Sequence, residues 1–295
     1  TKEITGLDNL CFAGGIALNC KANQRLIENN IFENIWIPPA SGDAGGAVGA
    51  AYIGYHHYFN KERIIQADNL LNNAYLGNEI TASEIEKQLK SFKVNYTQLS
   101  VENVVKQTAF HLNDKKIIGW FQGKMEFGPR ALGARSILAS PKFQDMQKHL
   151  NLSIKKREGF RPFAPIVLEE KAYEWFDIKK SSKYMLFTYN VKQATVIPSC
   201  THVDNTARVQ TVHSEGNKKL HQLLQEFEQL SGIPILINTS FNVRGEPIVA
   251  SVEDALRCFF YTEMDILVLD NFIITKSENT TFNFSSLTKV TYELD

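Results

Sequence analysis

Three cations stand close together in the stretch Gly119–Pro141, which reads GWFQGKMEFGPRALGARSILASP. Lys124, Arg130 and Arg135 are placed among Gly, Pro, Phe and Trp rather than among the Lys and Glu of an exposed helix. Residues 119–161 hold nine Lys or Arg and three Asp or Glu, although the chain has zero formal net charge. Guanidinium groups on glycine-containing turns can bind phosphate or carboxylate oxygens through paired hydrogen bonds. A solvated basic face is the alternative, but the surrounding residues favour a pocket for a phosphate-rich anion.

A second group of cations lies in Ile154–Pro165, which reads IKKREGFRPFAP. Lys155 and Arg157 belong to a run of three consecutive cations, and Arg161 follows between an aromatic residue and a proline. Because proline restricts the backbone beside it, Arg161 is aimed more rigidly than a surface lysine would be. We therefore add these three side chains to the candidate anion site.

The stretch Asp204–Val212, DNTARVQTV, has the alternation of a β-strand. A period of two places Thr206, Arg208 and Gln210 on one face of that strand. Such a face would present one cation and two hydrogen-bonding side chains to a cleft. An edge strand with one solvent-exposed face explains the same pattern equally well.

The stretch Pro234–Pro247, PILINTSFNVRGEP, begins as a buried strand and ends in polar residues. Ligands gather beyond the carboxyl ends of strands in α/β sheets, and this is such an end. Ser240 could be a nucleophile, but no histidine lies nearby in the sequence to act as its base. We therefore expect hydrogen bonds to a phosphate or an adenylate from Asn238 and Ser240, with Asn242 and Arg244 beside them.

Two glycine-containing turns near the start of the chain each follow a short strand and open a helix. Gly14 and Gly15 end the strand predicted at residues 9–13, and SGDAGG follows a second strand at residues 35–37. Free N–H groups at such turns bind anions, although neither turn matches a known nucleotide fingerprint and close packing through glycine explains them as well. Asp43 in the second turn is a candidate metal or phosphate-positioning residue, or a helix N-cap.

Helices and strands alternate along the whole chain, which indicates an α/β fold. Strands are expected at 94–99, 116–121, 184–189 and 233–238, a hairpin at 265–275, and helices at 81–90, 102–112, 144–150, 216–231 and 252–261. We place a domain boundary in the polar residues 60–76. Since the first ordered element is already a nucleotide-type strand–turn–helix, we expect the chain to be the C-terminal part of a longer protein.

The composition narrows the class of protein further. The four cysteines are scattered without a paired spacing, which favours free thiols in a reducing compartment over disulfides or zinc. No stretch approaches the length of a membrane span, and the N-terminus lacks the character of a signal peptide. We predict a cytoplasmic protein that does not bind membranes, and the neutral charge argues against general coating of nucleic acid.

Six segments together resemble the O-carbamoyltransferases of the nodulation-protein and antibiotic-tailoring type. The strings EFGPRALG, REGFRPFAP and NTSFNVRGEP are specific to that group in combination, and the resemblance runs from about residue 7 to residue 275. The six segments are Leu10–Arg25, Pro39–Ala51, Gly119–Pro141, Ile154–Pro165, His202–Val212 and Ile237–Pro247.

The resemblance implies two domains with different activities. Residues 1–75 would be the C-terminal part of an actin-like ATPase-fold domain, similar to the universal tRNA threonylcarbamoyl-transfer protein, and residues 76–295 a YrdC-like domain. The YrdC-like domain would form carbamoyl-adenylate from carbamoyl phosphate and ATP, with Mg²⁺ on the triphosphate. The actin-like domain, with a divalent metal of the Fe, Mn or Zn type, would transfer the carbamoyl group to a hydroxyl of a small-molecule acceptor.

The same resemblance assigns roles to residues of this chain. Gly14, Gly15 and Asn19 match the nucleotide-lining turn of the actin-like half, and Asp43 matches its metal-binding aspartate, whose histidine partners have no counterpart here. The remaining matches surround the carbamoyl-adenylate site. They are Lys124, Arg130 and Arg157 as catalytic residues near the phosphates, and Arg135, Lys155, Arg161, Thr206, Arg208, Asn238, Ser240, Asn242 and Arg244 as binding residues, with Asn238, Ser240 and Arg208 toward the carbamoyl or ribose end.

The chemistry of adenylate formation agrees with these residue types. A carbamate oxygen attacks the α-phosphorus and pyrophosphate leaves, so the protein mainly positions the reactants and neutralises charge. Two alternatives stay open: a non-catalytic YrdC-type module that binds nucleotide or double-stranded RNA, and a tRNA threonylcarbamoylation enzyme. The identity of the acceptor and homo-oligomerisation are also left open by the sequence.

Overall fold

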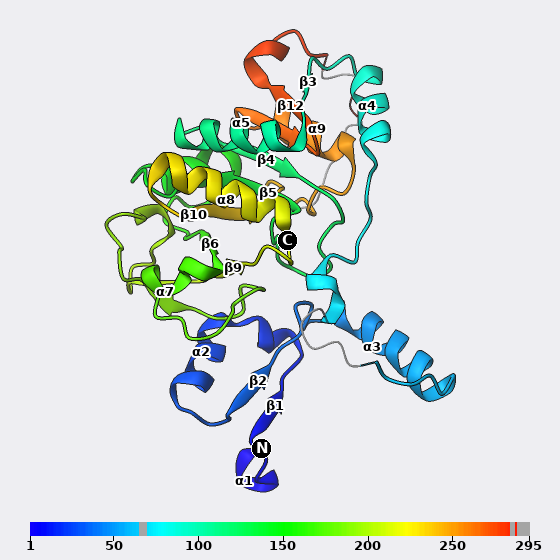
Figure 1. The fold of residues 1–295 in the computed structure, drawn as a ribbon, viewed down its shortest axis with the longest axis vertical. Coiled ribbons are helices and arrows are strands. Elements are labelled where there is room, and N and C mark those ends of the chain that lie inside the picture. Colours follow the sequence, from blue (N-terminus) through cyan, green and yellow to red (C-terminus); the bar gives the residue numbers. More distant parts are fainter. Residues whose placement is uncertain (65–69, 284–286, 288–295) are drawn as a thin grey trace.

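The computed structural model describes residues 1–64, 70–283 and 287, and its main feature is a mixed sheet of eight strands (Figure 1). The strand order is β3-β12-β11-β4-β5-β10-β6-β9, in which β11 and β4, and β6 and β9, run parallel and the other neighbours antiparallel. The strands are β3 Thr97–Gln98, β4 Ile118–Phe121, β5 Arg135–Ala139, β6 Ala164–Leu168, β9 Gln210–Val212, β10 Ile235–Ser240, β11 Ile266–Leu269 and β12 Phe272–Thr275.

Helices cover both faces of this sheet and give the domain two cores. On one face, α5 and α8 lie side by side (Figure 1), and their apolar residues pack with Trp120 and Leu236. On the other face, α4 and α9 pack with Phe121 and Ile237. Successive strand residues point to opposite faces, so β4 and β10 contribute to both cores. The helices are α4 Ala82–Ser91, α5 Val101–Asn113, α6 Met146–His149, α7 Ala172–Trp175, α8 Lys218–Ser231 and α9 Val252–Phe260.

The first 58 residues form a smaller set of elements beside the large sheet, in the lower part of Figure 1. Their two strands pair in parallel and make a sheet of their own. Asn23 of α2 donates hydrogen bonds to the carbonyls of Ala17 and Leu186, which ties this segment to the large domain. The elements are α1 Lys2–Thr5, β1 Asn9–Cys11, the 3₁₀ turn Gly15–Leu18, α2 Cys20–Glu28, β2 Asn34–Trp36 and α3 Gly45–Ile53.

The structure confirms the α/β class and several local predictions. Ser251 caps α9, Thr81 forms a capping box with Glu84 at the start of α4, and the predicted hairpin is the antiparallel pair β11–β12. The helix expected at 144–150 is shorter, and it continues as a π-helical turn over Leu150–Ile154. The domain boundary near residue 75 stays a prediction.

Two predicted strands are wrong. The strand expected at 184–189 is reduced to β7, Tyr189–Asn190, because Met185 has a φ of 56° and extended pairing cannot run through it. The stretch 204–212 is not one strand. It divides into β8, Thr206–Ala207, which pairs with β7, and β9 of the large sheet. The expected shared face of Thr206, Arg208 and Gln210 therefore does not exist.

Candidate functional site

Four arginine side chains meet at one cavity of about 300 Å³. Loops that are far apart in the sequence supply them, and the polar end of β10 closes the cavity. No Asp or Glu lines it among the residues that the structure describes. Six residues predicted for the site line this cavity: Arg130, Arg157, Arg161, Arg208, Asn238 and Ser240.

The cavity holds its positive charge without internal compensation. Burial, with the neighbouring Arg130, lowers the pKa of Arg208 to about 10, and burial also lowers the pKa of Arg130 and of Arg157. A pKa of about 10 still leaves the guanidinium charged at neutral pH. Within the described part of the chain, Arg130, Arg157 and Arg208 form no ion pair. An anion that enters the cavity would therefore reduce the repulsion among the arginines and offset the cost of burying their charges.

Glu126 shapes the loop that carries Arg130. Its Oε1 accepts hydrogen bonds from the backbone N–H groups of Leu132 at 2.7 Å and Ala134 at 2.6 Å, and from that of Arg135 at 3.3 Å. Gly128 has a φ of 137°, and a Cβ there would lie 3.1 Å from the carbonyl oxygen of Pro39. The loop is therefore fixed by a buried carboxylate on one side and by the N-terminal segment on the other.

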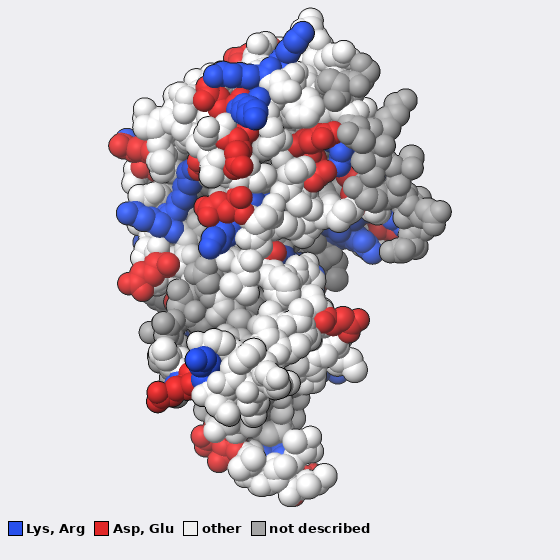
Figure 2. All heavy atoms as spheres, turned by 90° about the vertical axis from the view of Figure 1, so that its right-hand side faces the viewer, with Lys and Arg blue, Asp and Glu red and all other residues white. Residues whose placement is uncertain are grey.

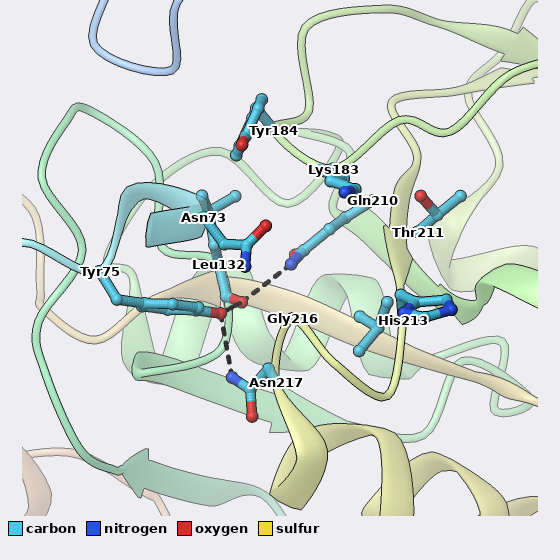
Figure 3. Close-up of a pocket in the computed structure, with 11 residues that line it drawn as sticks. Asn73, Tyr75, Leu132, Lys183, Tyr184, Gln210, Thr211, His213, Gly216 and Asn217 are labelled. Atoms are coloured by element: carbon cyan, nitrogen blue, oxygen red, sulfur yellow. Dashed lines mark hydrogen bonds between the residues drawn. The ribbon is translucent and has the colours of Figure 1, made fainter. Parts of the chain in front are cut away.

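A second group of hydrogen bonds supports the same loop from behind (Figure 3). Tyr75 Oη and Gln210 Nε2 both donate to the carbonyl of Leu132, at 2.9 and 2.8 Å, and Asn217 Nδ2 donates to Tyr75 Oη at 2.9 Å. The space among these side chains is only about 30 Å³. That volume holds little more than a water molecule, so we regard this pocket as a support for the loop rather than a ligand site.

Lys155 lies beneath the cavity rather than on its surface. Its side chain is buried, and Nζ donates to the carbonyl oxygen of Ser240 and, at 2.9 Å each, to the carbonyl oxygen and Oδ1 of Asn242. Burial lowers the pKa of Lys155 to about 7. Ser240 Oγ donates to Asn242 Oδ1 at 2.7 Å. Lys155 and Asn242 thus hold the turn that presents Ser240 to the cavity.

Four other predicted site residues lie away from the cavity lining. Arg135 is fully buried, donates to the carbonyls of Gln122 and Gly123, and stacks 3.5 Å from the ring centre of Phe121. Thr206 accepts a hydrogen bond from Lys21 in a separate hollow. The other two, Lys124 and Arg244, are exposed.

The glycine turns of the N-terminal segment border a different pocket, of about 660 Å³. Gly14 and Asp43 line it with mostly apolar neighbours, and the N–H of Gly14 donates to the carbonyl of Ser41 at 2.6 Å. Gly15 opens the 3₁₀ turn, and Asn19 caps α2 by accepting from Ala22 N–H. In the ranges that the structure describes, no group of three or more metal-ligating side chains lies together. The metal-binding role of Asp43 stays a prediction, because a single carboxylate does not complete a metal site.

Sequence reasoning missed the residues that hold the arginine loop. Glu126 is an acid inside a basic motif, which is a signal, but its partners are backbone groups six to nine residues away and become visible only when the loop closes. Gln210 was expected to face a cleft from one strand shared with Thr206 and Arg208. It is instead buried in β9, where it bridges the loop and β10 through hydrogen bonds with Leu132 and Asn238. Thr239 and Met185 also line the cavity, and no pattern in the sequence distinguishes them.

Family models match both parts of the chain. The model described as carbamoyltransferase C-terminus matches residues 109–276, and the one described as carbamoyltransferase N-terminus matches residues 1–52. The chain therefore belongs to the carbamoyltransferase family. Among the described helices, none is long and apolar enough to cross a membrane.

Curated relatives show the same relationship at the level of whole sequences. Nodulation protein NolNO of Sinorhizobium fredii is 40% identical over 93% of this chain and 41% of its own length. Nodulation protein NolO of Bradyrhizobium diazoefficiens is 38% identical over 97% of this chain and 53% of its own. The chain thus spans about half the length of the curated relatives it matches. A solved structure of full-length HypF aligns with a TM-score of 0.42 at 18% identity, covering 60% of this chain and 22% of HypF.

Proposed function

We propose that this chain forms carbamoyl-adenylate from ATP and carbamoyl phosphate, for transfer to a hydroxyl group of a small molecule. The observation that carries the proposal is the cavity itself, where four guanidinium groups and no carboxylate of the described residues surround about 300 Å³. The family match supports carbamoyl transfer over the threonylcarbamoylation alternative. A divalent metal in the N-terminal part, with Asp43 as one ligand, and the choice of acceptor belong to the same proposal.

The proposed reaction balances in two steps. Water first releases inorganic phosphate and carbamate from carbamoyl phosphate. A carbamate oxygen then forms a bond to the α-phosphorus of ATP, the bond from that phosphorus to the bridging oxygen breaks, and pyrophosphate leaves. The nucleophile is already anionic, so the protein need not supply a strong base. Its task is to hold two anions together against their repulsion.

The cavity residues fit that task in different ways. Arg130, Arg157 and Arg208 would neutralise the charge that grows on the leaving pyrophosphate and on the α-phosphoryl oxygens. Arg161, which pairs with Glu158 at 3.4 Å, stands further toward solvent and would bind the outer phosphate. Mg²⁺ would enter on the triphosphate, since no carboxylate among the described lining residues would hold it separately, and it would add charge neutralisation.

Exchange of labelled pyrophosphate into ATP, dependent on carbamoyl phosphate, tests the proposal. We expect Arg157→Ala and Arg130→Ala to lower the exchange rate by about 10²- to 10³-fold, as removal of one charge-stabilising donor does elsewhere. Arg63→Ala, which removes an exposed arginine that is not part of the cavity lining, is the matched control and should keep the wild-type rate. Absence of exchange in the wild-type chain would contradict the proposal.

Lys124 gives a sharper test of the structural placement. The sequence motif makes it a catalytic candidate, whereas the structure leaves its side chain exposed and outside the cavity lining. We expect Lys124→Ala to retain exchange within about threefold, because solvent screens an exposed charge that does not line the cavity. A loss comparable to that of Arg157→Ala would mean that the loop closes over the ligand and brings Lys124 in.

The RNA-binding alternative receives no support from the surface in view. Figure 2 shows Lys and Arg interspersed with Asp and Glu on that face, without a broad basic area. Recognition of RNA by shape requires phosphate contacts along such an area. Tight RNA binding with a steep salt dependence, in a chain without exchange activity, would favour that module over the enzyme.

A further inference from the structure

Asn151 is a fully buried side chain that contacts an arginine of the cavity without lining the cavity itself. It belongs to the π-helical turn Leu150–Ile154, where the N–H of Lys155 donates to the carbonyl of Leu150 at 2.9 Å. Turns of this kind are rare and occur frequently at functional sites. Asn151 precedes the basic motif that begins at Ile154, so that motif gives it no role.

Both ends of the Asn151 amide have partners, and the chemistry of these partners fixes its orientation. Nδ2 donates to the carbonyls of Gly159 at 3.2 Å and Arg161 at 2.8 Å. Oδ1 accepts from Nε of Arg157 at 2.7 Å, and the backbone carbonyl of Asn151 accepts from the N–H of Arg157 at 3.0 Å. Because carbonyls only accept and a guanidinium only donates, reversing the amide would break all three side-chain bonds. Asn151 therefore holds Arg157 by its side chain and Arg161 by its backbone.

The bond to Asn151 decides which edge of the Arg157 guanidinium a ligand can meet. A guanidinium can bind a phosphoryl group side-on, through Nε and one Nη nitrogen, or end-on, through both Nη nitrogens. Nε of Arg157 is used by Asn151, whereas its two Nη nitrogens form no hydrogen bond with the described residues. The ring of Phe163 packs against one face of the guanidinium, with Cζ 5.1 Å from the ring centre. The end-on edge is therefore the one left for an anion.

We infer that Asn151 is a positioning residue that holds Arg157 with both Nη nitrogens toward a single phosphoryl group in the cavity. This inference rests on the proposed function, in which Arg157 neutralises charge on the leaving pyrophosphate. Donors that are already oriented stabilise charge that develops in the transition state best, because nothing has to reorganise during the reaction. Asn151 supplies this orientation without touching the ligand.

Gln147 provides a matched control, because it supports the same loop without a hydrogen bond to the Arg157 side chain. Its Nε2 donates to the carbonyls of Phe160 at 3.0 Å and Arg161 at 3.1 Å. Asn151→Leu removes the bond to Arg157 together with bonds to the loop backbone, whereas Gln147→Leu removes bonds to the loop backbone alone. A general loosening of the loop should affect both variants alike, and a loss of orientation at Arg157 should affect only the first.

Pyrophosphate exchange by the full chain tests the role through a double-mutant cycle with Arg157→Ala. We expect Asn151→Leu to lower kcat about 30-fold and to leave the KM for ATP within about threefold, because the charge remains and only its orientation is lost. In the Arg157→Ala background the same substitution should cost less than about threefold, since no guanidinium is left to orient. Gln147→Leu should cost about threefold or less in both backgrounds. Equal losses from Asn151→Leu in the two backgrounds would overturn the inference.

The Nε–H of Arg157 gives a readout that does not depend on turnover. In the full chain with ¹⁵N-labelled arginine, Arg157→Ala identifies its NMR signal by removing it. We expect this proton to exchange with water at least about tenfold more slowly in the wild type and in Gln147→Leu than in Asn151→Leu. Exchange should also stay slow in Asn151→Asp, which keeps an acceptor for Nε and serves if Asn151→Leu does not fold. Fast exchange in the wild type would overturn the inference.

A crystal structure of the full chain with pyrophosphate tests the end-on geometry directly. Both Nη nitrogens should contact one phosphoryl group while Nε stays on Asn151, and a phosphoryl oxygen on Nε would overturn the assignment. Absence of exchange in the wild-type chain would overturn the proposed function and the positioning role within it, while the NMR signal would still decide whether Asn151 orients Arg157. Wild-type exchange with equal losses in the cycle would overturn the role of Asn151 and leave the enzyme standing.

Discussion

Helices α3 and α9 are both nine residues long, yet they differ completely in burial. α9 buries seven of its residues against the large sheet, whereas α3 buries none, and Figure 1 shows it projecting away from the rest of the molecule. The sequence of α3, GGAVGAAYI, is apolar on every side, a pattern typical of a buried helix. Composition thus sets what a helix can bury, and the presence of a partner decides whether it does.

The two candidate pockets differ in the same way, since one lies in the well-packed domain and the other in the poorly buried N-terminal segment. The arginine cavity is built on the domain with two packed cores, where Arg157 Nε donates to Oδ1 of the buried Asn151 at 2.7 Å. The N-terminal pocket is mostly lined by residues of the weakly buried segment. Arg130 takes part in the contacts between the two regions, since its Nη2 donates to the carbonyl of Leu18 at 3.4 Å. Substitutions that affect the stability or activity of only one region therefore test which region carries the chemistry.

The largest expected difference comes from one truncation in each helix. Phe259 is fully buried in α9, and Phe259→Ala should lower the free energy of unfolding by about 3–5 kcal/mol through lost burial and a cavity. Ile53 of α3 is 63% exposed, and Ile53→Ala should change stability by less than about 0.5 kcal/mol. Urea unfolding of both variants measures the pair. Equal losses would show that something in solution buries α3, such as a second copy of the chain.

A smaller but still large effect is expected at Glu126. Glu126→Gln keeps an acceptor for the N–H groups of Leu132 and Ala134 but removes the charge that strengthens those bonds. We expect a loss of about 1.5–3 kcal/mol in unfolding free energy, together with slower exchange because the Arg130 loop loosens. Glu79→Gln, at an exposed acid, is the control. Unaltered stability in Glu126→Gln would mean that the other bonds hold the loop without it.

Much of the fold and the basic character of the site could be predicted from sequence. Alternating apolar patterns gave the α/β class, and local chemistry gave the caps at Thr81 and Ser251 and the hairpin β11–β12. These features depend on neighbours within a few residues. The convergence of Arg130, Arg157 and Arg208 was an expectation drawn from motifs rather than from geometry.

What failed depends on tertiary contacts. The strand through Met185 was wrong because one positive φ breaks it, and the side chain then lines the cavity instead. Arg135 sits in the same basic motif as Arg130, but it lies within β5 and is buried over Phe121. Two arginines five residues apart thus have unrelated environments, and only the register of β4 and β5 tells them apart.

Lys155, the buried lysine beneath the cavity, should make the free energy of unfolding depend on pH. Burial lowers the pKa of Lys155 to about 7, so between pH 7 and the usual lysine pKa of about 10.4 the unfolded chain binds more protons than the folded one. Stability from this group therefore rises with pH, by at most about 1.4 kcal/mol per pH unit. Relative to Lys155→Met, wild-type unfolding free energy should gain about 2 kcal/mol from pH 7 to pH 9. Parallel pH profiles of unfolding free energy in wild type and Lys155→Met would contradict a lowered pKa of Lys155.

The junction between the two regions should show the smallest effects. Asn23 is buried and donates to Leu186 across the junction, so Asn23→Ala should lower the unfolding free energy by about 1–2 kcal/mol. Lys21 makes a half-exposed ion pair with Asp204 in the same junction, and solvent screening should limit the loss in Lys21→Ala to about 0.5 kcal/mol.

The Lys21 contact is nevertheless measurable at Asp204 itself. Hydrogen bonds from Lys21 and Thr206 lower the pKa of that carboxyl to about 2, so the stability it contributes is present above its unfolded pKa and is lost as pH falls toward 2. Lys21→Ala removes the larger cause, and the pKa of Asp204, followed by NMR, should rise toward the usual value of about 3.9. An unchanged pKa of Asp204 would mean that α2 of the N-terminal segment does not lie against the large domain in solution.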